Sequence, residues 1–452
     1  MRRRLVALLL LALSGCVPAS HGDVAARADA GPSALPPMKI FASPQPAAPA
    51  ISNADLTRDF LDLMFKLESG RDLRVFTRFE GPVSLRVTGD VPPSLRPDLS
   101  RLLGRLRREA GINIRQTNDP RANITIEAVS GAAIRRNLPQ AACFVVPNVS
   151  SLDEYNGARR AGFTSWARLE TRTKLSIFVP SDASPQELRD CLHEELAQAL
   201  GPLNDLYRLP DSVFNDDNVH TVLTGYDMLI LRIAYSSDLR SGMTRGEVAA
   251  RLPAILRRLN PAGDGQQASN LSETPSSWRK AIHTALGPGT SPAGRRNAAQ
   301  RALNIAERAG WQDHRRAFAH YALGRMLAPT DPQAANRNLA QADALYARLP
   351  RTDLHRAYVA TQLAAYKITQ GDAEAAELLI APHIATASQY ENATLLSTLL
   401  LLQAEALDLR GQRAQARSVR LDSLGWARYG YGPDWAVRAK LEEVSALNPA
   451  NG

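Results

Sequence analysis

The residues best suited to chemistry lie between His193 and Asn204, in a stretch with helical periodicity. A leucine stands at every fourth position from 188 to 200, which predicts a helix with one face on the core. Glu194 and Gln198 are also four residues apart, so they share the opposite face, whereas His193 is turned by about 100° from Glu194. Glu194, Gln198 and Asn204 offer oxygen donors, which suit hard cations better than zinc. A weak cation site and a plain amphipathic surface helix both fit this pattern.

The same stretch resembles a known family of zinc peptidases. Glu194-Glu195-x-x-Gln198-x-x-Gly201-x-x-Asn204 resembles the metzincin motif His-Glu-x-x-His-x-x-Gly-x-x-His with all three His ligand positions replaced. The resemblance places Glu195 at the general-base position and Gly201 where the chain turns toward the third ligand. It implies a metzincin-like fold without a competent zinc centre. The rival interpretation is an active metallopeptidase in which Glu194, Gln198 and Asn204 hold a metal and Glu195 activates its water.

The resemblance continues beyond Asn204-Asp205. Ser212-Val213-Phe214 stands where metzincins have the Met-turn, with Phe214 in place of the Met, and the segment from Leu223 to Asp227 is similar to the start of their closing helix. The wider pattern, Cys…Glu-Glu-x-x-Gln-Ala-Leu-Gly…Asn-Asp…Ser-x-Phe-Asn-Asp…Gly-Met, which includes Asp205 and Phe214, resembles the envelope family called domain of unknown function 2927. This likeness covers about residues 52–250 and implies no substrate.

The first residues predict export and a lipid anchor. Arg2–Arg4 are followed by an apolar run, Leu5–Leu13, that is too short to span a bilayer. Leu13-Ser14-Gly15-Cys16 resembles a lipobox, which implies removal of residues 1–15 and acylation of Cys16. We therefore expect a cell-envelope protein, held at the outer membrane and facing the periplasm. The remaining pair, Cys143 and Cys191, is even in an oxidising compartment and predicts a disulfide.

Composition divides the rest of the chain into two bodies. An Ala/Pro-rich tether, 16–51, precedes a mixed α/β domain, 52–256, and a linker, 257–275, rich in Asn, Gly, Gln and Ser. Helical periodicity or strand alternation in the α/β domain predicts these elements: helices 54–67, 94–110 and 185–200, and strands 83–87, 112–115, 124–126, 143–146 and 175–179.

The last part of the chain, 276–447, has the composition of an all-helical repeat domain. Gly371-Asp372-x-x-x-Ala376 resembles the crossing between helices in a tetratricopeptide repeat. Gly411 with Ala416 repeats this spacing forty residues later, and Thr330 with Ala335 precedes it by forty-one. Such arrays bind proteins along one face, although a generic helical bundle remains the alternative.

Charge and compartment narrow the candidate functions. The formal charge of +9 becomes 9 − 3 = +6 once Arg2–Arg4 are removed, which favours anionic surfaces. The compartment argues against nucleic acid as a partner. We expect a scaffold that reaches the membrane through its lipid and an envelope protein through its helical repeats; a module that binds an anionic cell-wall polymer is a further alternative. We expect no cofactor. The alternative is a divalent metal bound by the oxygen donors of Glu194, Gln198 and Asn204.

Overall fold

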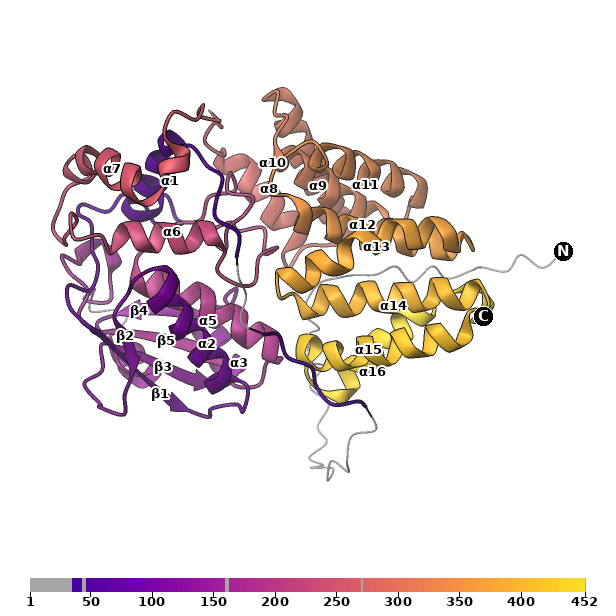
Figure 1. The fold of residues 1–452 in the computed structure, drawn as a ribbon, viewed down its shortest axis with the longest axis horizontal. Coiled ribbons are helices and arrows are strands. Elements are labelled where there is room, and N and C mark those ends of the chain that lie inside the picture. The colour runs from indigo at the N-terminus through magenta and orange to yellow at the C-terminus, as the bar shows by residue number, and fades with distance from the viewer. Residues whose placement is uncertain (1–34, 43–45, 159–161, 270, 452) are drawn as a thin grey trace. The chain divides into compact units, whose positions relative to one another are not determined.

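The computed structural model describes residues 35–42, 46–158, 162–269 and 271–451 (Figure 1). The predicted signal 1–15, the predicted lipidation site Cys16 and residues 17–34 of the predicted tether lie outside the described residues. Within the described residues, the chain divides into two compact units, one formed by residues between 42 and 273 and the other by residues 35–41 together with 274–451.

The α/β unit is built on a mixed five-stranded sheet in the order β2-β1-β3-β5-β4. All neighbours are parallel except β4, which is antiparallel to β5. Every residue of β5 is buried, as expected for an internal strand with both faces covered. The α/β fold class is confirmed. The strands are β1 (Val83–Gly89), β2 (Ile114–Gln116), β3 (Ile124–Val129), β4 (Phe144–Pro147) and β5 (Leu175–Pro180).

The helices of this unit enclose a continuous apolar core. Side chains from α2, α5 and the strands share one cluster of buried residues, and α5 contacts both β5 and β4. Helix α1 packs on α7, and α6 lies against α2 and α7. The described helices are α1 (Asn53–Phe65), α2 (Leu95–Glu109), α3 (Gly131–Asn137), α4 (Leu152–Ala158), α5 (Pro185–Leu200), α6 (Gly225–Ala234) and α7 (Arg245–Leu259), with short 3₁₀ turns at 166–168 and 261–263.

The second unit is a stack of paired helices, which confirms the predicted helical region (Figure 1). Asp331 and Asp372 cap α11 and α13, and Gly371 and Gly411 adopt the left-handed φ values, 75° and 76°, that end the preceding helices. The predicted turns therefore join the two helices of a pair: α10 to α11, α12 to α13, and α14 to α15. The helices are α8 (Ser276–Leu286), α9 (Pro292–Arg308), α10 (His314–Leu327), α11 (Pro332–Tyr346), α12 (Asp353–Thr369), α13 (Ala373–Gln389), α14 (Ala393–Leu409), α15 (Arg413–Tyr431) and α16 (Asp434–Ser445).

Residues 35–41 form an extended strap along α15, within this helical unit. The Lys39 N–H donates to the carbonyl of Gly425 at 3.0 Å, and Phe41 stacks on Trp426 with ring centroids 4.4 Å apart. The Arg428 guanidinium donates to the Pro36 carbonyl at 2.9 Å. A Cβ at Gly425 would lie 3.0 Å from the Lys39 side chain, so the glycine permits this close approach.

Candidate functional site

Helix α5 carries the predicted site, and its ends are held by specific contacts. At its start the Ser184 hydroxyl accepts a hydrogen bond from the Glu187 N–H at 3.2 Å. At its other end the buried Arg172 donates to the carbonyls of Gln198, Ala199 and Gly201 at 2.5–2.8 Å. A guanidinium at this position satisfies carbonyls that lack helical partners and complements the helix dipole. Burial lowers the pKa of Arg172 to about 10, so it stays charged at neutral pH.

A disulfide joins α5 to the segment before β4, as the sequence predicted. Cys143 and Cys191 are bonded with their Cα atoms 5.9 Å apart. Since β4 is the edge strand beside β5, the bridge ties the helix to the sheet across 48 residues of sequence.

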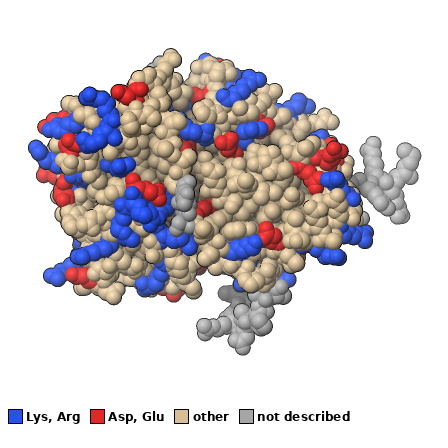
Figure 2. Space-filling model, viewed as in Figure 1, with Lys and Arg blue, Asp and Glu red and all other residues tan. Residues whose placement is uncertain are grey.

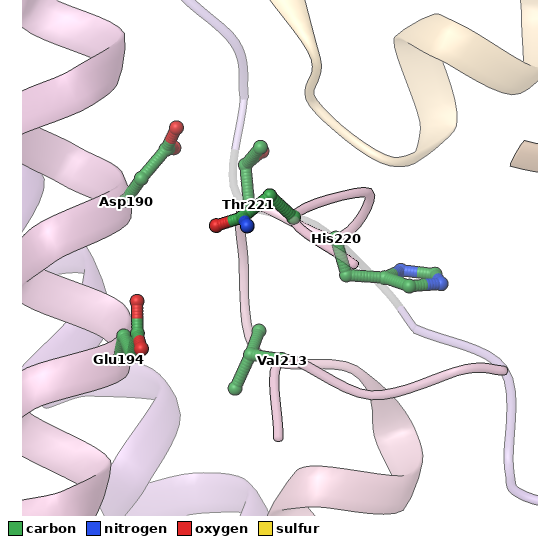
Figure 3. A pocket seen from close by; sticks show the side chains of 6 residues that line it. Asp190, Glu194, Val213, His220 and Thr221 are labelled. Atoms are coloured by element: carbon green, nitrogen blue, oxygen red, sulfur yellow. The ribbon is translucent and has the colours of Figure 1, made fainter. Parts of the chain in front are cut away.

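The two histidines near the site both contact the backbone. His193 is buried, and its Nδ1 accepts a hydrogen bond from the Leu223 N–H at 3.1 Å. Burial, reinforced by Arg105 and Arg189, holds the pKa of His193 well below its ordinary value, so the ring is neutral. The His220 Nε2 lies 2.9 Å from the Pro210 carbonyl oxygen, and its ring points away from α5 (Figure 3).

A small cleft separates α5 from the loop that leads to α6. Asp190 and Glu194 project from α5 toward this loop (Figure 3). Burial raises the pKa of Asp190 well above its ordinary value, although Arg189 opposes the shift. The cleft volume is about 80 Å³, far below the several hundred Å³ of a typical site for an organic ligand. The loop side of the cleft is lined by Val213, Asn218, His220 and Thr221.

Around Glu194 the fold gathers five mutually repelling carboxyl groups, which we name the acidic cluster: Glu68, Glu194, Glu195, Asp205 and Asp216. Burial, with repulsion from Glu68 and Asp216, raises the pKa of Glu194 to about 7. Burial and neighbouring carboxylates raise the pKa values of Glu195 and Asp205 well above the ordinary range. Glu195 is 5% exposed, and its Oε2 has no hydrogen-bond partner. Within the acidic cluster, Glu194, Glu195 and Asp205 are therefore protonated at higher pH than ordinary carboxyl groups.

The other two predicted metal ligands, Gln198 and Asn204, are both buried. Gln198 is buried on α5, and the Asn204 amide donates to the Asp62 carbonyl of α1 at 3.0 Å. Gly201 ends α5 against Met64, whose Cε would lie 3.3 Å from an added Cβ. Among the described residues no three His, Cys, Asp or Glu side chains are placed so that they could share a metal ion.

The Ser212–Phe214 turn is bonded to the start of α6. The fully buried Asp227 carboxylate accepts hydrogen bonds from the Ser212 hydroxyl at 2.5 Å, the Val213 N–H at 3.1 Å and the Thr224 N–H at 2.8 Å. Asp227 and Thr224 form a capping box, and Phe214 is buried in the core. One carboxylate thus fixes both the turn beneath the cleft and the helix after it.

Comparison with known proteins places this unit in a family. Residues 53–254 match the family described as protein of unknown function (DUF2927). The α/β unit carries a DUF2927 domain. No curated protein and no solved structure matches the chain.

The disulfide of the DUF2927 domain suggests an extracytoplasmic location, because such bonds persist in oxidising compartments. No helix in the described part of the chain is long and apolar enough to cross a membrane.

Sequence patterns did not indicate three residues that contribute to this site: Glu68, Arg172 and Asp216. Glu68 follows α1 and Arg172 precedes β5, so both reach α5 only through the tertiary fold. Asp216 belongs to the Asn-Asp-Asp run after Phe214, whose charge density was the one available signal.

Proposed function

We propose that this chain is a protein-binding scaffold of the cell envelope, anchored through lipid on Cys16, with a metzincin-like domain that has lost its zinc centre. The observation that supports the loss most directly is the donor chemistry at α5. Glu194, Gln198 and Asn204 replace three imidazoles, and Glu194 faces other carboxyls. The imidazoles of His193 and His220 lie nearby, but each contacts a backbone group, the Leu223 N–H and the Pro210 carbonyl respectively.

Ligand chemistry argues against hydrolysis at this site. Zinc centres that activate water use three protein ligands, usually with imidazole among them, and leave one open position. Here the Asn204 amide contacts α1, and the cleft beside Glu194 has a volume of only about 80 Å³. The order of motif helix, Ser212–Phe214 turn and α6 supports the metzincin resemblance in backbone arrangement alone.

The helical unit supports the binding half of the proposal. Large apolar side chains project into solvent from its helices: Leu378 is 71% exposed, Leu421 59% and Trp435 64%. Trp is enriched among the residues that contribute most of the binding energy at protein interfaces. Paired-helix stacks commonly use such side chains to bind proteins.

Site-specific photocrosslinking in cells tests this role. A photoreactive amino acid at position 421 or 435 should give one discrete adduct, whereas the same probe at Gln415, an exposed polar position of α15, should give none. With the probe at 421, Trp435→Glu should weaken the adduct if both side chains meet the same partner. Equal labelling from all three positions, or from none, would contradict a binding role for this surface.

The anchor is tested separately. Cys16→Ser should move the protein from the membrane fraction into the soluble periplasm or leave an unprocessed precursor. Membrane-bound, lipid-labelled protein carrying this substitution would contradict the anchor while leaving the scaffold role open to its own test.

A further inference from the structure

A second and larger groove, which we name the α6 groove, lies within the α/β unit away from the acidic cluster. Its volume is about 640 Å³, within the range of sites that bind organic ligands. Gly225, Met228, Leu229 and Arg232 line it; their spacing of three, four and seven residues places them on one face of α6. Met228 and Leu229 supply an apolar floor, with Arg232 at the exposed end.

The walls of the groove come from distant parts of the sequence. One wall is the extended segment Pro46–Pro49, and another is the end of α7 with Leu259 and Pro261. A Cβ at Gly225 would lie 2.1 Å from the Ala47 carbonyl oxygen, so the glycine lets the extended segment pass directly over α6. The close packing of the extended segment on α6 therefore forms the groove, and apolar residues line its sides.

The groove has a net positive charge where residues of α2 line it. Glu109 lines the groove, but both its oxygens already accept hydrogen bonds from Arg105, at 2.8 and 2.9 Å. Arg105, Arg108 and Arg232 against Glu109 give a local charge of 3 − 1 = +2. The buried Nη1 of Arg105 has no hydrogen-bond partner. Figure 2 shows Lys and Arg gathered over the region of α2.

We propose that the α6 groove binds a single-chain anionic amphiphile, with its apolar chain over Met228 and Leu229 and its anionic head between Arg108 and Arg232. Guanidinium groups favour carboxylate and phosphate because they donate parallel hydrogen bonds to two oxygens. Contact between the apolar chain and the apolar floor should add binding free energy, so an amphiphile should bind more tightly than an inorganic anion. The head group is a carboxylate or a phosphate, and this site is independent of the proposed scaffold role.

Fluorescence titration of the full chain with dansylated undecanoate tests the site. Saturable binding should be displaced by laurate or by lysophosphatidate, and the better competitor identifies the head group. Dodecanol, which has the chain without the charge, should compete about tenfold or more weakly. Dodecanol equal to laurate, or no saturable binding, would overturn the proposal.

Paired variants separate the groove from general surface charge. Arg108→Gln with Arg232→Gln should weaken binding about tenfold or more, because each removes a charge-assisted contact. Arg96→Gln with Arg115→Gln removes the same charge from exposed positions outside the groove and should leave binding unchanged. Leu259→Trp should fill the groove and abolish binding in a folded protein. If the two double variants bind alike, the arginines of the groove are not the recognition site.

Discussion

Glu194 combines a position at the cleft beside α5 with a pKa near neutral pH. Its position on the face opposite the leucine stripe was predicted from periodicity, and it lines the cleft as expected for that face. Burial and the neighbouring Glu68 and Asp216 raise its pKa to about 7, so a large part of its population is protonated at neutral pH. A protonated carboxyl is a poor metal ligand, which agrees with the proposed loss of the zinc centre.

The raised pKa of Glu194 predicts that stability falls as pH rises. A pKa of about 7 in the folded state against the ordinary 4.5 means that the folded protein binds more protons between these values, so the free energy of unfolding decreases across this window. Glu194→Gln keeps the site neutral at every pH. It should raise the free energy of unfolding of the α/β unit at pH 8 by about 2 kcal/mol and change it little at pH 4.5.

Denaturant titrations at the two pH values measure this effect. Glu374→Gln, at an exposed position of α13, is the control and should change neither value appreciably. A Glu194→Gln variant that is destabilised at pH 8 would instead indicate that the charged carboxylate is required there, as a bound cation would demand.

At the residue scale, sequence patterns identified the helix faces but not their tertiary neighbours. Helical spacing separates Glu194 from His193, and the structure gives His193 a backbone partner in the next loop. No local pattern could indicate that Arg172 would end α5 or that Glu68 would approach Glu194. These contacts depend on how strands and loops far apart in sequence fold together.

The elements around α5 were largely predictable because each carries a local signal. Strand alternation located all five strands, and the Ser184 cap with Pro185 located the start of α5. The pairing order β2-β1-β3-β5-β4 and the antiparallel direction of β4 had no such signal, because register and order are decided by long-range packing.

The Cys143–Cys191 disulfide should contribute strongly to the stability of the α/β unit. Cys143→Ser with Cys191→Ser releases a loop of 48 residues, and loop-closure entropy predicts a loss of about 4 kcal/mol in the free energy of unfolding. Denaturation of the oxidised protein and of the double variant measures the difference. A change below about 1 kcal/mol would show that packing alone holds α5 on the sheet.

The strap on α15 is an ordered element that composition did not predict. Pro-rich sequence predicted a tether, whereas residues 35–41 contact Gly425, Trp426 and Arg428. The signal available was the aromatic Phe41, which a solvated linker does not need. An extended segment without its own periodicity becomes ordered only through such partners.

Hydrogen exchange at the Lys39 amide tests the strap. Phe41→Ala removes a buried ring and its stacking on Trp426, so exchange of this amide should speed up about tenfold or more. Ile40→Ala, at a position 56% exposed, should leave the rate near that of the parent chain. Equal rates in the two variants would mean that Phe41 does not hold the strap.

For the whole molecule, two units of different character share one chain. The α/β unit provides the small cleft beside Glu194 and the separate α6 groove, and the helical unit provides exposed Leu378, Leu421 and Trp435. The broad division into α/β and helical parts followed from composition, since strands and Ala/Leu-rich helices differ in periodicity. Partner identity leaves no comparable trace in sequence.

The proposed loss of the zinc centre can be tested by the zinc stoichiometry of the purified full chain. Elemental mass spectrometry measures it after equilibration with excess zinc and gel filtration. We predict far less than one zinc per chain, because positions 194, 198 and 204 hold oxygen donors and no imidazole. Glu194→His with Gln198→His and Asn204→His should raise the ratio toward one if the backbone is metzincin-like. One zinc per native chain, with peptide hydrolysis that Glu195→Gln abolishes, would show instead that the protein is a metallopeptidase.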